Sequence, residues 1–181
     1  MISIRAATAQ DASAIAHVHV ESWKTTYAGI VPDEYLAGLD EILRTKLWHE
    51  LLATESLVLV AELGGRMVGF AHGGTNREPL KECDAELYSI YLLHEAQRHG
   101  TGTALLRGIA TGLADRGLTR MAVWVLEKNP SRNFYERMGA HLAASKVIDI
   151  GGMKLMEVAY VWAELRKLVP KSEADTTPQP R

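Results

Sequence analysis

Apolar residues recur along the chain in runs that predict strands and helices in turn. Alternation over residues 2–5 is typical of a short, half-buried strand. The apolar runs at 56–63 and 66–72 flank Gly64-Gly65, a dipeptide that favours a two-residue hairpin. The remaining strands are expected at 86–93, 120–126, 141–150 and 154–162.

Helical periodicity separates several of these strands. Thr8, with Asp11 three residues later, is typical of a capping box and predicts a helix that ends near Trp23. The remaining helices are expected at 32–52 with a break near 38–40, at 100–116, and at 129–139. This order of elements predicts an α/β fold, a mixed sheet with helices on both faces.

The length and charge of the chain narrow its class. The 181 residues suit one domain, which we place at 1–165, and the polar residues 166–181 are expected to be a disordered tail. A net charge of −2 gives no broad footprint for nucleic acid or an anionic membrane. The single cysteine, Cys83, and the lack of a signal peptide or membrane span predict a cytoplasmic protein.

A glycine-bearing loop stands between a predicted strand and the helix at 100–116. Gly100 and Gly102 carry no Cβ, so the backbone there can approach a ligand closely. The unpaired N–H groups and partial positive charge of a helix N-terminus suit a phosphate or diphosphate. The third glycine of the dinucleotide fingerprint and the lysine of the phosphate-binding loop are missing.

Two motifs give the chain a family resemblance. Gln97, Gly100 and Gly102 fill the Gln/Arg-x-x-Gly-x-Gly/Ala pattern, and residues 129–139 contain an Asn followed by Phe-Tyr-Glu-x-x-Gly. In this order they resemble the GNAT superfamily of acyl-CoA-dependent N-acyltransferases. The resemblance covers about residues 2–162 and implies a mixed, mostly antiparallel sheet of about seven strands, splayed between the fourth and fifth.

The resemblance also implies how acetyl-CoA would be held. The pantetheine arm would pair with the fourth strand, and the helix-opening loop would bind the diphosphate. The residues assigned to the coenzyme are Ile90, Tyr91, Leu92, Gln97, Arg98, His99, Gly100, Thr101, Gly102, Thr103, Asn129, Ser131 and Tyr135. Six residue steps separate Asn129 from Tyr135, where many members have seven, so Ser131 or Asn133 could take the place of Asn129.

Acyl transfer to an amine requires removal of a proton from the amine and protonation of the leaving thiolate. By resemblance, Tyr135 is the general acid and Glu86, at the start of the fourth strand, is the candidate base; strand alternation places Glu86, Tyr88 and Ile90 on one face. Each also has a plain structural interpretation, a core aromatic for Tyr135 and a solvated strand end for Glu86. Trp124 occupies the position where members that acetylate protein N-termini carry a glutamate.

The resemblance places the acceptor near Trp23, Tyr27 and Tyr88. We expect an N-acetyltransferase that moves an acetyl group from acetyl-CoA to a primary amine by direct attack in a ternary complex. The expected acceptor is a small molecule, with no nucleic acid or membrane partner, and a homodimer is left open. No metal is expected, because the histidines lack ligand spacing. The alternatives are a non-catalytic acyl-CoA-binding or regulatory domain, a protein N-terminal acetyltransferase, or a flavin- or nucleotide-binding protein.

Overall fold

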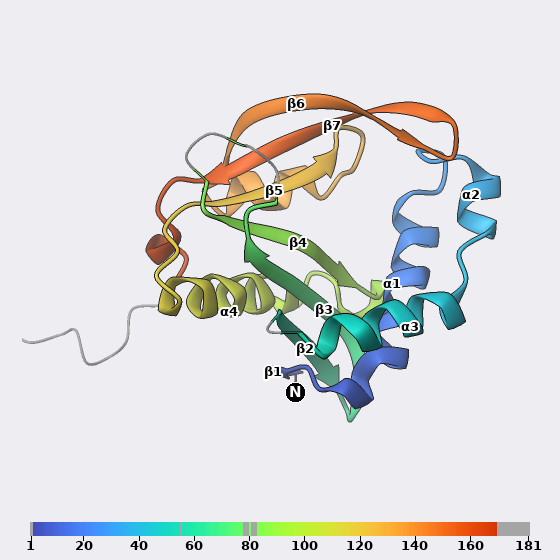
Figure 1. Ribbon diagram of the computed structural model, residues 1–181, viewed down its shortest axis with the longest axis horizontal. Coiled ribbons are helices and arrows are strands. Elements are labelled where there is room, and N and C mark those ends of the chain that lie inside the picture. Colours follow the sequence, from blue (N-terminus) through green and yellow to red (C-terminus); the bar gives the residue numbers. More distant parts are fainter. Residues whose placement is uncertain (1, 55, 78–79, 81–82, 170–181) are drawn as a thin grey trace, which may run out of the picture.

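The computed structural model describes residues 2–54, 56–77, 80 and 83–169, and its strands form one seven-stranded sheet in the order β1-β2-β3-β4-β5-β7-β6 (Figure 1). Neighbouring strands are antiparallel except β4 and β5, which are parallel. The strands are β1 (Ile2–Ala6), β2 (Leu57–Leu63), β3 (Arg66–Thr75), β4 (Ala85–Leu92), β5 (Met121–Leu126), β6 (His141–Ile150) and β7 (Met153–Trp162). The predicted mixed, mostly antiparallel sheet is confirmed.

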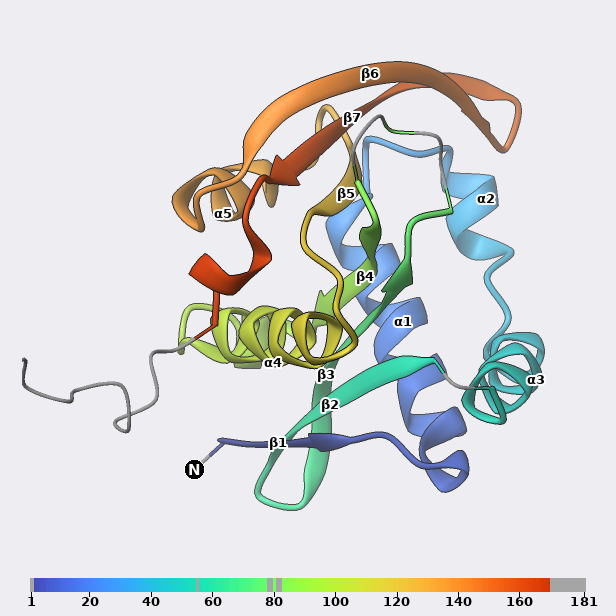
Figure 2. The same ribbon diagram turned by 60° about the vertical axis from the view of Figure 1, so that its left-hand side comes forward.

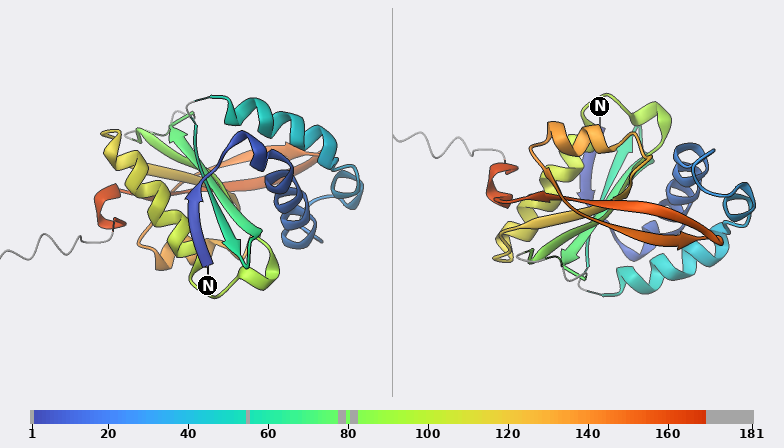
Figure 3. Two further views of the ribbon diagram at one scale, coloured as in Figure 1. Left: turned by 90° about the horizontal axis from the view of Figure 1, so that it is seen from below. Right: turned by 90° about the horizontal axis from the view of Figure 1, so that it is seen from above.

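Helices cover both faces of this sheet. The α-helices are α1 (Ala12–Thr26), α2 (Asp33–Ala37), α3 (Glu41–Leu52), α4 (Thr101–Asp115) and α5 (Arg132–Arg137), and the 3-10 helices are η1 (Ala9–Asp11), η2 (His94–Ala96) and η3 (Leu165–Lys167). In the left panel of Figure 3, α4 and α1 lie on either side of the strands. Buried residues of α4 and α5 form one core against the sheet, and those of α1 and α3 form a second.

The break expected near residues 38–40 is present, because α2 ends at Ala37 and Asp40 caps α3. The Asp40 carboxylate accepts hydrogen bonds from the N–H groups of Ile42 and Leu43 at 2.6 and 3.1 Å. The apolar residues of α3 do not form a continuous buried face, and Trp48 is the buried residue of this helix. Ile42, Leu43 and Leu47 are 55–70% exposed, because only one side of this helix meets α1 and the sheet.

The sheet opens between β4 and β5. These strands pair at only two positions, Ala85 with Met121 and Glu86 with Ala122. Beyond Glu86, β4 pairs with β3 alone, and β5 pairs with β7. Figure 2 shows the two parts of the sheet diverging, with β6 and β7 arching away from β4. The predicted splay between the fourth and fifth strands is confirmed.

The folded unit extends a little past residue 165. Leu165 and Leu168 are buried in the core beside α4, and the Leu165 N–H donates to the Thr119 carbonyl at 2.8 Å. Residues 170–181 of the predicted tail lie outside the described residues. Among the residues described, no helix combines the length and apolar character needed to cross a membrane.

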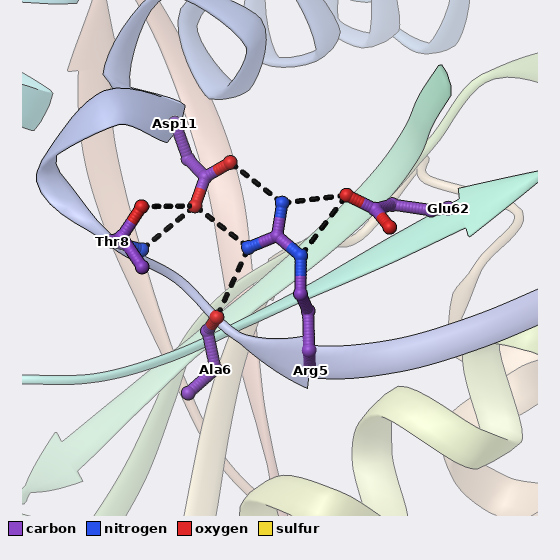
Figure 4. A network of polar contacts seen from close by, with 5 residues as sticks. All are labelled: Arg5, Ala6, Thr8, Asp11 and Glu62. Atoms are coloured by element: carbon purple, nitrogen blue, oxygen red, sulfur yellow. Dashed lines mark hydrogen bonds and ion pairs between the residues drawn. The ribbon is translucent and has the colours of Figure 1, made fainter. Parts of the chain in front are cut away.

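A polar network ties β1 to the start of the first helical segment (Figure 4). The predicted capping box is present. The Asp11 carboxylate accepts from the Thr8 N–H at 2.7 Å, and the Asp11 N–H also donates to the Thr8 carbonyl at 3.0 Å. Arg5 donates two bonds of 2.8 Å to Asp11 and also pairs with Glu62 on β2. Hydrogen bonding from Arg5 lowers the pKa of Asp11 from 3.8 to about 2.

This shifted pKa predicts an acid-dependent loss of stability. A carboxyl whose pKa is lower in the folded state contributes stability that is present above its unfolded pKa and is lost as pH falls, here between about 4 and 2. Thermal unfolding of Asp11→Asn is therefore expected to show a shallower fall in Tm over that window than the parent protein. Glu62→Gln keeps the Arg5–Asp11 pair and is expected to retain the parent slope; equal slopes in Asp11→Asn and the parent would contradict the assignment.

Candidate active site

The gap between β4 and β5 is a cleft of about 810 Å³. Its volume lies within the range of small-molecule and cofactor sites. It runs from the N-terminus of α4, past the start of α5, to the end of α1. Among the predicted coenzyme residues, those that line it are Ile90, Tyr91, Leu92, Gln97, Arg98, Gly100, Gly102, Thr103, Asn129, Ser131 and Tyr135.

The loop at the start of α4 has an unusual backbone. Gly100 has φ 81°, a left-handed conformation that favours glycine, and a Cβ added there would meet no atom within 4 Å. Arg98 also has a positive φ, 62°, although it carries a side chain. Such conformations in non-glycine residues concentrate at ligand sites, where the surrounding structure holds them. The loop therefore presents open backbone to the cleft.

Three other loop residues have distinct positions. The Gln97 amide nitrogen donates to the Leu92 carbonyl at 3.2 Å, which fixes the loop against the end of β4. His99 Nδ1 lies 2.6 Å from the Gln97 carbonyl oxygen. Thr101 is buried at the start of α4. Gln97 lines the cleft, whereas His99 and Thr101 do not.

A β-bulge in β4 changes which side chains share a face. His72 of β3 pairs with Ser89 and Gly73 pairs with Leu87, so Tyr88 has no partner in the ladder. Side-chain alternation reverses at such a residue. The expectation that Glu86 and Ile90 share a face is therefore wrong: Ile90 packs with the α4 core, and Glu86 lies on the opposite face from Leu87 of that core.

Glu86 is buried and its carboxylate is paired with Arg77. It accepts from the Arg77 guanidinium at 2.7 Å and from the Arg77 N–H at 3.0 Å. Glu86 does not line the cleft, whereas Tyr88, two residues later on β4, does. Its contacts favour a structural role for Glu86, and its role as general base stays a prediction.

Tyr135 lies in the middle of the cleft wall. It is buried on α5, its ring packs edge-on against Trp162 at 6.0 Å, and it lines the cleft with its neighbour Phe134. Burial raises the pKa of the Tyr135 phenol well above 10.0. The phenol is therefore a protonated donor throughout the neutral range.

A hydrogen-bonded set of side chains connects α1 with the start of α5. Asn129 Nδ2 donates to the Tyr27 hydroxyl at 3.3 Å, and Asn129 Oδ1 accepts from the Ser131 N–H at 2.8 Å. On the other side, Trp23 Nε1 donates to the Tyr91 hydroxyl at 2.9 Å. Burial raises the pKa of Tyr27, so its hydroxyl also stays protonated. Asn129 is thus held in place, while Ser131 and Asn133 line the cleft beside it.

Hydroxyls and aromatic rings form the end of the cleft away from the N-terminus of α4. Of the predicted acceptor residues, Tyr27 and Tyr88 line this end, whereas Trp23 lies behind Tyr91. Sequence reasoning did not assign the other lining residues here, which are Thr25, Thr26, Ser89, Val123 and Trp124. Trp124 alternates with the core residues Val123 and Val125, and period-two alternation on the fifth strand could have revealed it.

Among the described residues, no group of three or more histidine, cysteine, aspartate or glutamate side chains could hold a metal ion. The polar groups that the described cleft residues supply are hydroxyls, amides, backbone N–H groups, the His94 imidazole and two arginines, Arg98 and Arg137.

Comparison with known protein families shows to which family the chain belongs. Residues 19–140 match the model of the acetyltransferase (GNAT) family. The chain belongs to the GNAT family. This span contains the α4 loop, both walls of the cleft and Tyr135, and the resemblance noted from the two motifs is confirmed.

Several GNAT relatives match nearly the whole chain. It is 38% identical over 168 residues to the uncharacterized N-acetyltransferase YuaI of Bacillus subtilis, covering 93% of this chain and 96% of YuaI. It is 28% identical over 167 residues to a spermidine N(1)-acetyltransferase of Thermoplasma acidophilum, covering 88% and 98%. The crystal structure of the PaiA N-acetyltransferase from T. acidophilum in complex with coenzyme A superposes with a TM-score of 0.64 at 25% identity, covering 87% of this chain and 98% of that one.

Proposed function

We propose that this GNAT protein transfers an acetyl group from acetyl-CoA to the primary amine of a small molecule, by direct attack in a ternary complex. The observation that carries the proposal is the continuous cleft between β4 and β5. It joins an open glycine backbone at the start of α4 to the buried phenol of Tyr135, and then reaches a wall of hydroxyls and aromatic rings. These three regions correspond to diphosphate, thioester and acceptor.

The described residues fit a long thioester substrate. Gly100 leaves open space where any other residue would place its Cβ, and the first-turn N–H groups of α4 favour a negatively charged group. Beyond Glu86, the cleft-facing edge of β4 pairs with no strand in the described part of the chain, so its N–H and C=O groups are available for an extended amide-bearing ligand. Arg98 and Arg137 add positive charge along the cleft.

Tyr135 supplies the proton for the leaving thiolate in this proposal. Its pKa is raised by burial, so the phenol carries a proton at any pH at which the protein works. Asn129, held between Tyr27 and the Ser131 N–H, fixes the loop that leads into α5. Removal of the amine proton is assigned to Glu86 as a proposal only, and its ion pair with Arg77 is the observation against it.

Direct transfer is favoured over a covalent acyl-enzyme. The single thiol, Cys83, does not line the cleft. A small-molecule acceptor is supported by the relative that is named for acetylation of spermidine, at 28% identity. A cytoplasmic location and a homodimer stay predictions.

The test is binding followed by turnover. Titration calorimetry of the full chain with acetyl-CoA is expected to show a single site with a sub-millimolar dissociation constant. Thiol release from acetyl-CoA, followed across a library of primary amines, is then expected to depend on the amine. Binding without amine-dependent release would favour the non-catalytic acyl-CoA-binding alternative, and absence of binding would remove the enzyme proposal.

A further inference from the structure

The acceptor end of the cleft, which is formed by Thr25, Thr26, Tyr27, Tyr88 and Trp124, has an unusual arrangement of charge. None of the described residues that line the cleft is an aspartate or glutamate. A polyamine keeps at least one ammonium group after the reacting amine has lost its proton, and that cation is normally met by carboxylates or by free aromatic faces. The walls here offer it hydroxyls instead.

Of the three aromatic rings at this end, that of Tyr27 packs against Trp23 at 4.7 Å, and the other two already carry cations. The Arg77 guanidinium lies over the Tyr88 ring at 3.7 Å, and the Lys146 ammonium lies over the Trp124 ring at 4.2 Å. Tyr88 and Trp124 both line the cleft, one on each side of the gap. A second cation brought to these rings would meet like charge close by, and like charges in a partly buried site repel strongly.

Each cation has a carboxylate partner that is less accessible than itself. Arg77 pairs with Glu86 at 2.7 Å, and their side chains are 59% and 4% exposed. Lys146 pairs with Glu157 at 3.5 Å, with exposures of 32% and 19%. The pairs are neutral in sum, and the positive member of each is the more exposed. Neither cation lines the cleft itself, but each lies over a ring that does, so its charge lies within a few ångströms of that ring.

We propose that the preferred acceptor is a small primary amine that also carries a carboxylate, and that Arg77 and Lys146 attract this carboxylate to the acceptor end. The inference rests on the proposed function and narrows its substrate class. The amine nitrogen reaches the thioester between β4 and β5, while the carboxylate remains near the two cations. Polyamines such as spermidine are disfavoured, in contrast to the relative named for that substrate.

Matched pairs of amines test this inference directly. Thiol release from acetyl-CoA is measured with tyrosine and tyramine, phenylalanine and phenethylamine, and leucine and isoamylamine, together with spermidine and putrescine. At least one amino acid is expected to exceed its decarboxylated partner, and both polyamines, by about tenfold or more in kcat/KM, the scale of discrimination that a specific polar contact gives.

A higher kcat/KM for the decarboxylated partners or the polyamines overturns the inference and leaves the proposed function intact. The inference is also overturned if none of the amines tested gives thiol release. Calorimetry with acetyl-CoA then separates the cases, because the proposed function fails as well only if the coenzyme does not bind.

Two variants test the named cations. Lys146→Gln is expected to raise the KM for the carboxylate-bearing acceptor by about fivefold or more, the direction that loss of a steering charge gives. The KM for the decarboxylated partner and the affinity for acetyl-CoA are expected to stay unchanged. The control is Lys154→Gln, at an exposed lysine on β7 of the same hairpin. It is expected to leave the KM for both acceptors and the affinity for acetyl-CoA unchanged.

The double variant Arg77→Gln/Glu86→Gln removes the second pair without leaving a buried charge alone. Because Glu86 is also the proposed general base, kcat is expected to fall for both members of an amine pair, and the measurement that tests the inference is KM, which is expected to rise for the carboxylate-bearing member alone. An equal change of KM for both members would overturn the inference.

Discussion

Tyr135→Phe is expected to lower kcat by about 10²–10⁴-fold, the usual contribution of a positioned general acid. The variant removes one hydroxyl from a buried ring that lines the cleft and keeps the packing of that ring against Trp162. Because a leaving thiolate needs a proton, and burial keeps the Tyr135 phenol protonated, the loss is expected in the chemical step. Steady-state kinetics by thiol release measure kcat, and calorimetry measures coenzyme affinity, which is expected to stay within about threefold of the parent value.

Tyr160→Phe is the matched control for this experiment. Tyr160 is also buried, its ring centroid lies 6.3 Å from that of Tyr135, and it does not line the cleft. Its hydroxyl bonds Glu136 at 2.6 Å and Arg132 at 3.1 Å, so its loss is expected to lower Tm with little change in kcat. If Tyr135→Phe kept a kcat within about threefold of the parent while Tm fell, Tyr135 would be a core aromatic and the acid would lie elsewhere.

Local pattern and motif together predicted much of the fold, because most strands here pair continuously and carry regular alternation. The hairpin at Gly64-Gly65 and the break before Asp40 each follow from turn or cap chemistry within a few residues. The bulge at Tyr88 does not, since it arises from the register between β3 and β4 rather than from either strand alone. A period-two count across it therefore assigned Glu86 and Ile90 to the same face.

The site residues also differ in whether a local motif or only the fold reveals them. Gly100, Gln97 and Tyr135 belong to short motifs, and the structure brings all three to one cleft. The partner of Glu86 was not predictable, because Arg77 follows a strand end nine positions earlier and only the fold brings the two together. The cation over Trp124 likewise comes from β6, a strand that reaches β5 only through β7.

Gly100→Ala is expected to weaken acetyl-CoA binding by about tenfold or more, which corresponds to about 1.4 kcal/mol. Gly100 lines the cleft with φ 81°, and among the described residues none beyond its two chain neighbours has an atom within 4 Å of the position its Cβ would take. The added methyl group therefore projects into open space, where it reduces the room available to a diphosphate at the α4 N-terminus. The left-handed backbone adds a cost to folding of about 1–2 kcal/mol for a residue with a side chain.

Gly117→Ala separates these two effects. Gly117 follows the other end of α4 with φ 83°, and its Cβ position is also free of neighbours within 4 Å, but it does not line the cleft. The two variants are therefore expected to lose similar amounts of thermal stability, while only Gly100→Ala loses coenzyme affinity in calorimetry. If both variants bound acetyl-CoA as the parent does, the diphosphate would not lie against Gly100, and the assignment of this end of the cleft to the coenzyme would be wrong.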